Sequence, residues 1–471
     1  MVGIRSGLGL RCAGFLFVLT TVAGAGAPGG AGQRAALPHL RPDGHLALAW
    51  LYGGTGADYR AQIEAMAGAT VVSPTWWYLD LDHPGQITDD ADPGLVAWAQ
   101  QRGLAVWPLF GNHIDADVTD QVLRDPALRR QVVGGVVEAV VRAGADGVNV
   151  DFENLHDRTA PLLTQLVAEL ESALPGKIVS VDVTAMTDTW VLDNWSTAFD
   201  RAGLGTHADY VMLMAYDQHN SLRRNGPVAG LQWVSESTEF LLRTVPAHKI
   251  VLGLPFYSRD WADEASATQG VELDATLGMA AMAGRLAERS QGAVYDEIAG
   301  QDLHTYVDER GRTHRVWLED PASIQRKTGL VGQFGLAGTA AWRAGFEQPE
   351  VWTAIDQVLT SSAAPAVAGQ PGQPVQPAIP PQTAVEPAVG VPMVTEDPAA
   401  APTVTAPAPP PRAPAPGPGP FDAAVPAVAA ASASAAGAPG SRGALMLFVA
   451  LGLLSAVVGA QARWLIRPRG R

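Results

Sequence analysis

Residues 144–155 read GADGVNVDFENL, and this stretch decides how the rest of the chain is interpreted. In a β-strand, alternate side chains share a face. One face of this strand is then apolar and carries Val148, Val150 and Phe152, whereas the other carries Asn149, Asp151 and Glu153. The apolar face suits packing against helices. The polar face is therefore expected to line the inside of a barrel and to reach its carboxyl-terminal mouth at Glu153.

Two acidic side chains in succession inside a barrel are costly in free energy unless they are paired or protonated. Like charges at that separation raise one pKa, which is the condition that a general acid needs near neutral pH. The alternative is a structural pair of carboxylates held by Arg or Lys. No Arg or Lys lies on the inward side of the other predicted strands. We therefore interpret Asp151 and Glu153 as catalytic.

This strand belongs to an alternation of short apolar runs and helical stretches between about Pro38 and Leu359. The apolar runs that we predict as strands are 46–52, 69–79, 105–111, 147–153, 178–185, 210–217, 250–257 and 336–342. Apolar residues at helical spacing occur between them, in 94–102, 127–143, 159–173 and 233–244. Strands that are mostly each followed by a helix predict an α/β fold, a (β/α)8 TIM barrel at residues 36–360.

The connection between the seventh and eighth predicted strands is too long for one helix. Three short apolar segments in it are separated by polar turns, AGQD and ERGR. This pattern predicts a small α+β insertion at 260–330 that walls one side of the cleft.

Both ends of the chain have the composition of membrane-targeting segments. Residues 1–27 combine Arg5 and Arg11 with a short apolar run and small residues, which predicts a signal peptide. Residues 362–441 are rich in Pro and Ala and predict a disordered linker. An apolar segment at 444–462 predicts a transmembrane helix, with a basic cytoplasmic tail at 463–471. We expect an exported, single-pass protein of the cell membrane with its barrel outside.

Composition excludes several kinds of site. The only cysteine, Cys12, lies in the predicted signal peptide, so disulfides, cysteine-ligated metals and cysteine nucleophiles are excluded from the mature chain. The formal charge of −15 argues against nucleic-acid binding. Metal-type histidine spacing is absent. We expect no metal site and a monomer.

Four motifs in order along the chain resemble those of glycoside hydrolase family 18. Asp146 to Glu153 resembles the family's D-G-x-D-x-D-x-E on strand four, and Tyr216-Asp217 looks like M-x-Y-D on strand six. GLPFYSRDW at 253–261 is similar to G-x-P-x-Y-x-R-x-W on strand seven, and Trp342 falls where the family keeps a tryptophan at the end of strand eight. Within the family, the chain looks most like the bacterial branch of spore-cortex and cell-wall lytic N-acetylglucosaminidases.

The resemblance implies a role for each matching residue. Glu153 would protonate the glycosidic oxygen and later deprotonate water, and Asp151 would orient the substrate's own N-acetyl group, which acts as the nucleophile. Tyr216 would hydrogen-bond that acetyl group, Asp217 would contact the sugar, and Trp342 would form the apolar floor beneath it. The implied outcome is retention, without a metal or an organic cofactor.

Asn149 stands where the family usually has Asp. An amide can donate a hydrogen bond to Asp151 but cannot share a proton with it. We expect this departure to change the pH profile and the rate rather than the type of reaction.

Further substrate-binding candidates are aromatic or polar residues near strand ends, since sugar rings stack on flat apolar faces. One of Trp76 and Trp77 is expected to form a flat platform for a sugar ring, and we choose Trp76. Tyr257 and Asn149 are further candidates for substrate binding. Arg259 has two open roles, binding substrate or bracing the insertion. The residues that we expect to be structural are Trp107 in the core and His113, which follows Asn112 at the end of strand three.

These features predict hydrolysis of β-1,4-linked glycans that contain N-acetylglucosamine, either peptidoglycan or chitin-like. A membrane tether favours a wall substrate. The alternatives are a lectin-like barrel that binds glycans at the cell surface without cutting them, and a surface scaffold that presents the barrel to a partner protein.

Overall fold

The computed structural model describes residues 40–41, 44–220, 224–263 and 270–362. The segments predicted as signal peptide, transmembrane helix and basic tail, and the predicted linker beyond Ser362, lie outside these residues. Among the helices of the described residues, none combines the length and the apolar composition needed to cross a bilayer.

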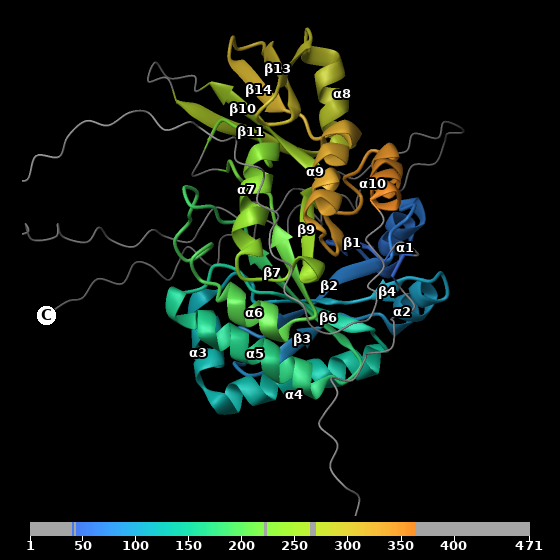
Figure 1. Cartoon of the computed structure of the whole chain (residues 1–471), viewed down its shortest axis with the longest axis vertical. Coiled ribbons are helices and arrows are strands. Elements are labelled where there is room, and N and C mark those ends of the chain that lie inside the picture. Colours follow the sequence, from blue (N-terminus) through green and yellow to red (C-terminus); the bar gives the residue numbers. More distant parts are fainter. Residues whose placement is uncertain (1–39, 42–43, 221–223, 264–269, 363–471) are drawn as a thin grey trace, which may run out of the picture. The chain divides into compact units, whose positions relative to one another are not determined.

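Parallel strands close into a barrel, which confirms the predicted α/β fold (Figure 1). β1 (Leu46–Leu51) pairs with β2 (Val71–Leu79) on one side and with β15 (Gly338–Trp342) on the other, so the ring is closed. The strands between them follow the order of the sequence: β5 (Leu109–Gly111), β6 (Gly147–Asp151), β7 (Ile178–Thr184), β8 (Tyr210–Met214) and β9 (Ile250–Pro255). A short antiparallel strand, β3 (Ile87–Asp89), extends β2.

The third barrel strand, predicted as one run, is split into β4 (Ala105–Val106) and β5. Pro108 lies between them and has no N–H group to donate to the ladder. Its carbonyl still accepts from the Asn149 N–H at 2.9 Å, which keeps the split strand beside β6.

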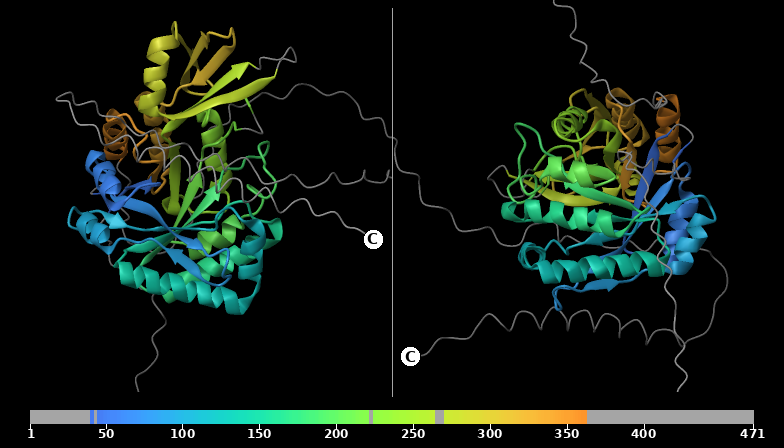
Figure 2. Two further views of the ribbon diagram at one scale, coloured as in Figure 1. Left: turned by 180° about the vertical axis from the view of Figure 1, so that it is seen from behind. Right: turned by 60° about the horizontal axis from the view of Figure 1, so that its bottom comes forward.

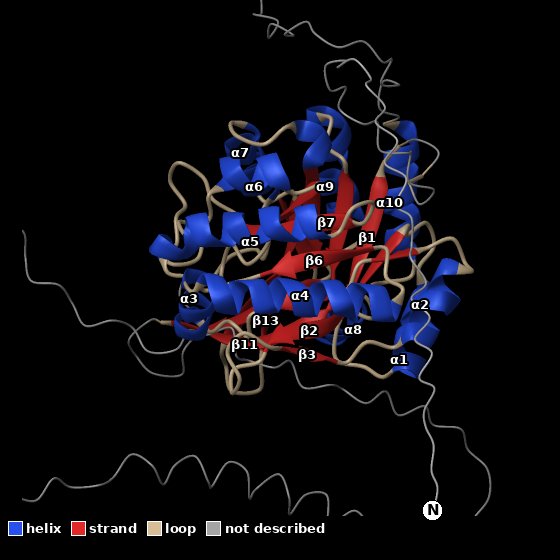
Figure 3. Ribbon diagram, turned by 90° about the horizontal axis from the view of Figure 1, so that it is seen from below, coloured by secondary structure: helices blue, strands red, loops and turns tan. Residues whose placement is uncertain are grey.

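Helices cover the outside of the barrel, and Figure 3 shows α4 and α5 side by side along the strands. The α-helices of the barrel are α1 (Gly56–Ala65), α2 (Pro93–Gln100), α3 (Ala116–Arg124), α4 (Pro126–Ala143), α5 (Ala160–Ala173), α6 (Arg201–His207), α7 (Leu231–Leu242), α9 (Pro321–Phe334) and α10 (Glu350–Ser361). Short 3₁₀ turns occur at Asp157–Thr159 and Ala247–Lys249. Asp92 and Asp125 cap α2 and α4, each followed by proline in the first turn, which is a strong local start signal.

Two separate cores lie on the two faces of the barrel sheet. Val148, Val150 and Phe152 pack in the outer core between strands and helices. Trp50 and Leu109 belong to the inner core that fills the barrel. The alternation read from residues 144–155 is therefore confirmed.

At Gly338, near the start of β15, the backbone of β15 lies very close to that of β1. Its φ is 152°, and a Cβ there would lie 1.9 Å from the Leu46 carbonyl oxygen. Only glycine fits this contact, which belongs to the seam that closes the barrel.

The insertion after β9 is a five-stranded antiparallel sheet with one helix, and Figures 1 and 2 show it gathered at one end of the barrel. Its elements are β10 (Tyr257–Asp263), β11 (Val271–Gly278), α8 (Met279–Arg289), β12 (Ala293–Asp296), β13 (Gln301–Val307) and β14 (Thr313–Trp317). The sheet thus starts before residue 260 and ends before residue 330. The seventh-strand run was predicted as 250–257, but β9 ends at Pro255 and Tyr257 already begins β10. Helix α9 contacts β9 and β15 and belongs to the barrel.

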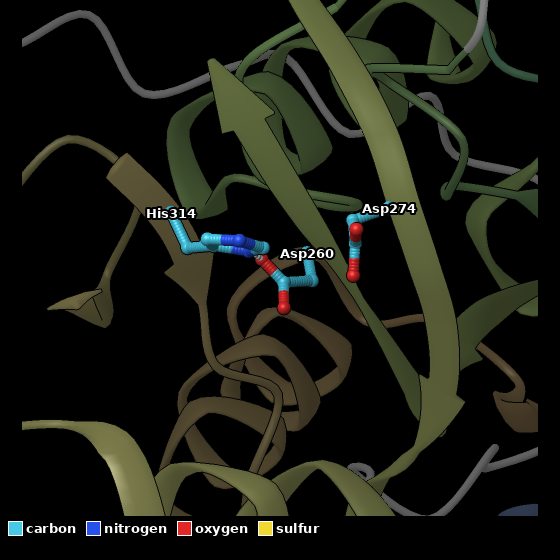
Figure 4. A group of neighbouring side chains, drawn as sticks. All are labelled: Asp260, Asp274 and His314. Atoms are coloured by element: carbon cyan, nitrogen blue, oxygen red, sulfur yellow. Dashed lines mark hydrogen bonds and ion pairs between the residues drawn. The ribbon is translucent and has the colours of Figure 1, made fainter. Parts of the chain in front are cut away.

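Asp260 of β10, Asp274 of β11 and His314 of β14 lie close together in this sheet (Figure 4). Among the residues that the structure describes, they are the one group of His, Asp and Glu ligand atoms near enough to one another to hold a metal ion. However, Arg285 pairs with Asp260 at 2.8 Å and Arg312 pairs with Asp274 at 2.8 Å. Two guanidinium groups would repel a cation, so we interpret the group as an ion-pair network that joins β10, β11, β14 and α8.

Candidate active site

Strained backbone marks the carboxyl-terminal ends of three barrel strands. His113 and Ile114 after β5, Asn154 after β6 and Asp217 after β8 have φ values of 52°, 59°, 52° and 63°. Side chains other than glycine rarely occupy this region, and such strain collects at functional sites. The strain therefore lies on the face where the sequence places the active site.

Glu153 follows β6 by two residues, and its backbone is held by the side chain of Asn112. The Asn112 Nδ2 donates to the Glu153 carbonyl at 2.9 Å, and the Asn112 Oδ1 accepts from the Glu153 N–H at 3.1 Å. Asn112 also donates to the Thr119 hydroxyl at 2.9 Å. Because Asn112 comes from the end of β5, the position of Glu153 is set by two neighbouring strands.

Three carboxyl groups gather at this mouth: Asp151, Glu153 and Asp182 of β7. Burial, and after it the charges of Asp151 and Asp217, raise the pKa of Glu153 well above its ordinary value. Burial raises the pKa of Asp151 to about 7, although a hydrogen bond with Asp182 lowers it. A carboxyl group with a raised pKa keeps its proton near neutral pH, so Glu153 can serve as a general acid.

Asn149 lies beneath these carboxyl groups and is fully buried. The sequence allowed it to donate to Asp151, but in the structure its Nδ2 donates to Asp182 Oδ1 at 2.7 Å. Its Oδ1 accepts from the Trp50 indole N–H at 2.7 Å. This burial corrects the prediction that Asn149 contacts substrate, because a side chain without exposed surface cannot touch a bound sugar.

Tyr216, Asp217, Tyr257 and Arg259 form the side of the mouth next to the insertion. Asp217 accepts a hydrogen bond from the Tyr257 hydroxyl and pairs with Arg259 at 2.7 Å. Arg259 also donates to the His219 carbonyl at 2.6 Å. Of the two roles left open for Arg259, these contacts support bracing, because they tie β10 of the insertion to the loop after β8.

The ring of Trp342, at the end of β15, packs between the ring of Trp50 in β1 and the ring of Tyr52, which follows β1. Its centroid lies 6.0 Å from that of Trp50 and 5.9 Å from that of Tyr52. Trp50 is buried, whereas Tyr52 is 42% exposed. Trp342 is partly exposed and so can offer a face to a sugar ring.

The other aromatic candidates differ in how far they are accessible. Trp77 is fully buried and donates to Asp89 at 2.7 Å, so it cannot form a platform. Trp76 is 4% exposed and lines, together with Tyr52, a pocket of about 390 Å³. Trp107 belongs to the inner core and stacks on Tyr210, which is partly buried and packs against that core, with ring centroids 5.7 Å apart.

His113 stacks on Tyr78 with ring centroids 4.2 Å apart, and burial lowers its pKa. Its ring is thus engaged in packing, in agreement with the structural role expected for it.

The sequence analysis missed Asp182 and Trp50. A signal for Asp182 was present, because Ser180, Asp182 and Thr184 share one face of a strand whose other face is apolar. The signal for Trp50 was weaker, since a tryptophan in an apolar run is ordinarily a core residue.

Comparison with known proteins gives a consistent result. The profile of the glycosyl hydrolases family 18 matches residues 86–347. The chain is 31% identical over 240 residues to the putative sporulation-specific glycosylase YdhD of Bacillus subtilis, covering 50% of this chain and 55% of that one. It is 28% identical over 234 residues to the cortical fragment-lytic enzyme of the same organism, covering 49% and 54%. The matched region thus spans about half the length of these two relatives.

Among solved structures, a chitinase from Chromobacterium violaceum superposes with a TM-score of 0.61 at 25% identity. The match covers 67% of this chain and 99% of the chitinase.

Proposed function

The chain belongs to family 18 of the glycosyl hydrolases and is a glycoside hydrolase, and we propose that it cuts β-1,4 bonds in N-acetylglucosamine-containing glycans with retention of configuration. One observation carries the proposal. Glu153 lies at the mouth with its backbone held by Asn112. Burial and the neighbouring Asp151 and Asp217 raise its pKa, which suits a general acid.

In this proposal the substrate supplies the nucleophile. Glu153 protonates the glycosidic oxygen as the bond breaks, while the carbonyl oxygen of the substrate's N-acetyl group attacks the anomeric carbon. Asp151 orients that group. Glu153 then takes a proton from the water that opens the intermediate. The separation of two carboxylates therefore does not report the stereochemistry here.

Tyr216 is proposed to donate a hydrogen bond to the same N-acetyl group. Burial raises the pKa of its phenol, and the charge of Asp151 acts in the same direction. The hydroxyl thus keeps its proton and remains a donor across the working pH range. Trp342 is proposed as the floor beneath the reacting sugar, with Asp217 at its edge.

We propose peptidoglycan as the substrate class. Support comes from the likeness to a cortical fragment-lytic enzyme. It also comes from the sequence of residues 1–27 and 444–462, whose composition fits export and a membrane tether. A tethered hydrolase meets the polymer next to the membrane more often than a dissolved one.

The test is turnover of the full chain on purified peptidoglycan and on soluble chitin oligomers, followed as new reducing ends. We expect N-acetylglucosamine reducing ends from both, with the higher kcat/KM on peptidoglycan. A higher value on chitin would overturn the substrate class but not the reaction. Binding of both glycans without any cleavage would instead favour the lectin-like alternative.

A further inference from the structure

A directed chain of hydrogen bonds crosses the inside of the barrel beneath the site. It starts at Trp50, whose indole N–H can only donate. Since this N–H lies 2.7 Å from Asn149 Oδ1, the oxygen of that amide must face Trp50. The Ser73 hydroxyl, at 3.4 Å, points to the same oxygen. The NH₂ group of Asn149 must then face Asp182, and the orientation of the amide is fixed by its partners.

Asp182 is the next member of the chain and is 1% exposed. Its Oδ1 accepts from Asn149 Nδ2 at 2.7 Å. The register of β6 and β7 pairs Val150 with Val181, so the residues that follow, Asp151 and Asp182, are neighbours. Their two carboxyl groups lie close enough to form a hydrogen bond with each other.

Two carboxyl groups can hydrogen-bond to each other only if a proton lies between them. Asp151 Oδ1 needs such a proton, because it is buried and receives no N–H or hydroxyl donor from the described residues. A protonated Asp182 supplies that donor. Its two oxygens then have distinct roles, one accepting from Asn149 and the other donating to Asp151.

The surroundings place the proton on Asp182 rather than on Asp151. Burial, and after it the charge of Asp151, raise the pKa of Asp182 well above its ordinary value. The hydrogen bond from Asn149 lowers this pKa, but by less than burial and the charge of Asp151 raise it, and the hydrogen bond to Asp151 raises it as well. The same bond lowers the pKa of Asp151. The other groups that face Asp182 are the carboxyl group of Glu153 and the phenol of Tyr216, which follows β8.

We propose that Asp182 is a positioning residue that holds the proton that Asn149 cannot hold, and that it donates this proton in a hydrogen bond to keep Asp151 ionised and aligned beside Glu153. The acidic partner of Asp151 is thereby supplied by the neighbouring strand β7 instead of by residue 149. The role deepens the proposed function and rests on it.

Two substitutions at Asp182 separate this role from others. In Asp182→Asn, the amide can repeat both contacts, since its oxygen accepts from Asn149 and its nitrogen donates to Asp151. In Asp182→Ala, both contacts are lost. We expect kcat on a soluble chitin oligomer at pH 7 to stay within about threefold for the Asn variant and to fall about 10–100-fold for the Ala variant, the loss expected for one hydrogen bond to a charged group.

The acidic limb of the pH profile of kcat/KM distinguishes a proton donor from a structural residue. Asp151 must be ionised, and the bond from Asp182 lowers its pKa. Losing that bond in Asp182→Ala is expected to move the limb to higher pH by about one to two units, whereas Asp182→Asn leaves it in place. If Asp182 were ionised, Asp182→Ala would remove a like charge and move the limb to lower pH.

The full chain and both variants are compared, with Glu153→Gln as the control that the measured reaction is the enzyme's own. A limb that moves to lower pH or does not move in Asp182→Ala, while the native chain is active, would overturn this inference and leave the proposed function intact. No turnover by the native chain would overturn the proposed function. The inference is then decided by ¹³C NMR titration of the carboxyl carbons, in which Asp182→Ala is expected to raise the pKa of Asp151. Should the Ala variant not fold, a loss above tenfold in Asp182→Asn overturns the inference by itself.

Discussion

Replacing Glu153 by Gln is expected to lower kcat on N-acetylglucosamine oligomers by about 10²–10⁴-fold. An amide has nearly the shape of the carboxyl group but has no proton to give to the leaving oxygen. The hydrogen bonds that hold residue 153 run from Asn112 to the backbone and remain available to the variant. Release of reducing ends by the full chain and by the variant, at equal protein concentration, gives the ratio.

The pH dependence of turnover tests the role of Glu153 in a second way. Because burial and the charges of Asp151 and Asp217 raise the pKa of Glu153, the protonated form persists at neutral pH. Turnover by the native chain should therefore decline as the pH rises through that value, since the acid form is lost. A Gln variant that retains more than about a tenth of native kcat would remove Glu153 from the role of general acid.

Replacing Lys327 by Met is expected to lower the free energy of unfolding by about 3–5 kcal/mol. Lys327 of α9 is 1% exposed, and its Nζ lies 2.8 Å from Oε2 of Glu319, which is 0% exposed. The Ser323 hydroxyl donates to the same oxygen at 2.8 Å. Without the lysine, a carboxylate stays buried without its counter-charge at the junction of the insertion and the barrel. Denaturant unfolding followed by tryptophan fluorescence measures the change.

Two controls accompany this variant. Arg130→Met removes a cation from the exposed surface of α4 and should change the free energy of unfolding by no more than about 0.5 kcal/mol. Lys327→Met combined with Glu319→Gln should recover part of the lost stability, because no unpaired charge is then buried. A loss below about 1 kcal/mol in the single variant would show that the pair is not coupled as its geometry implies.

The barrel could be predicted because each of its strands is a short apolar run that is buried on both faces. The prediction was less accurate where pairing between strands determines where each strand begins and ends. Tyr257 follows β9 after a single residue, so one apolar run covers parts of two strands that belong to different sheets. The residues of β11 are mostly exposed or partly buried, without a regular alternation, so this segment gave no strong strand signal on its own.

The site shows the same division. Asp151 and Glu153 stand on one strand, so their common face follows from the alternation of side chains alone. Asp182 lies on the neighbouring strand, and its bond to Asn149 depends on the register between β6 and β7. A single sequence does not fix that register. The contacts of Arg259 likewise depend on how the insertion folds back over the loop after β8.

The measurement that tests the central claim most directly is the anomeric configuration of the first product. The full chain is mixed with an N-acetylglucosamine oligomer, and ¹H NMR follows the new reducing end before mutarotation. Hydrolysis assisted by the substrate's N-acetyl group predicts that the β-anomer appears first and then equilibrates. The α-anomer appearing first would contradict the account, because it would require water to attack the anomeric carbon directly.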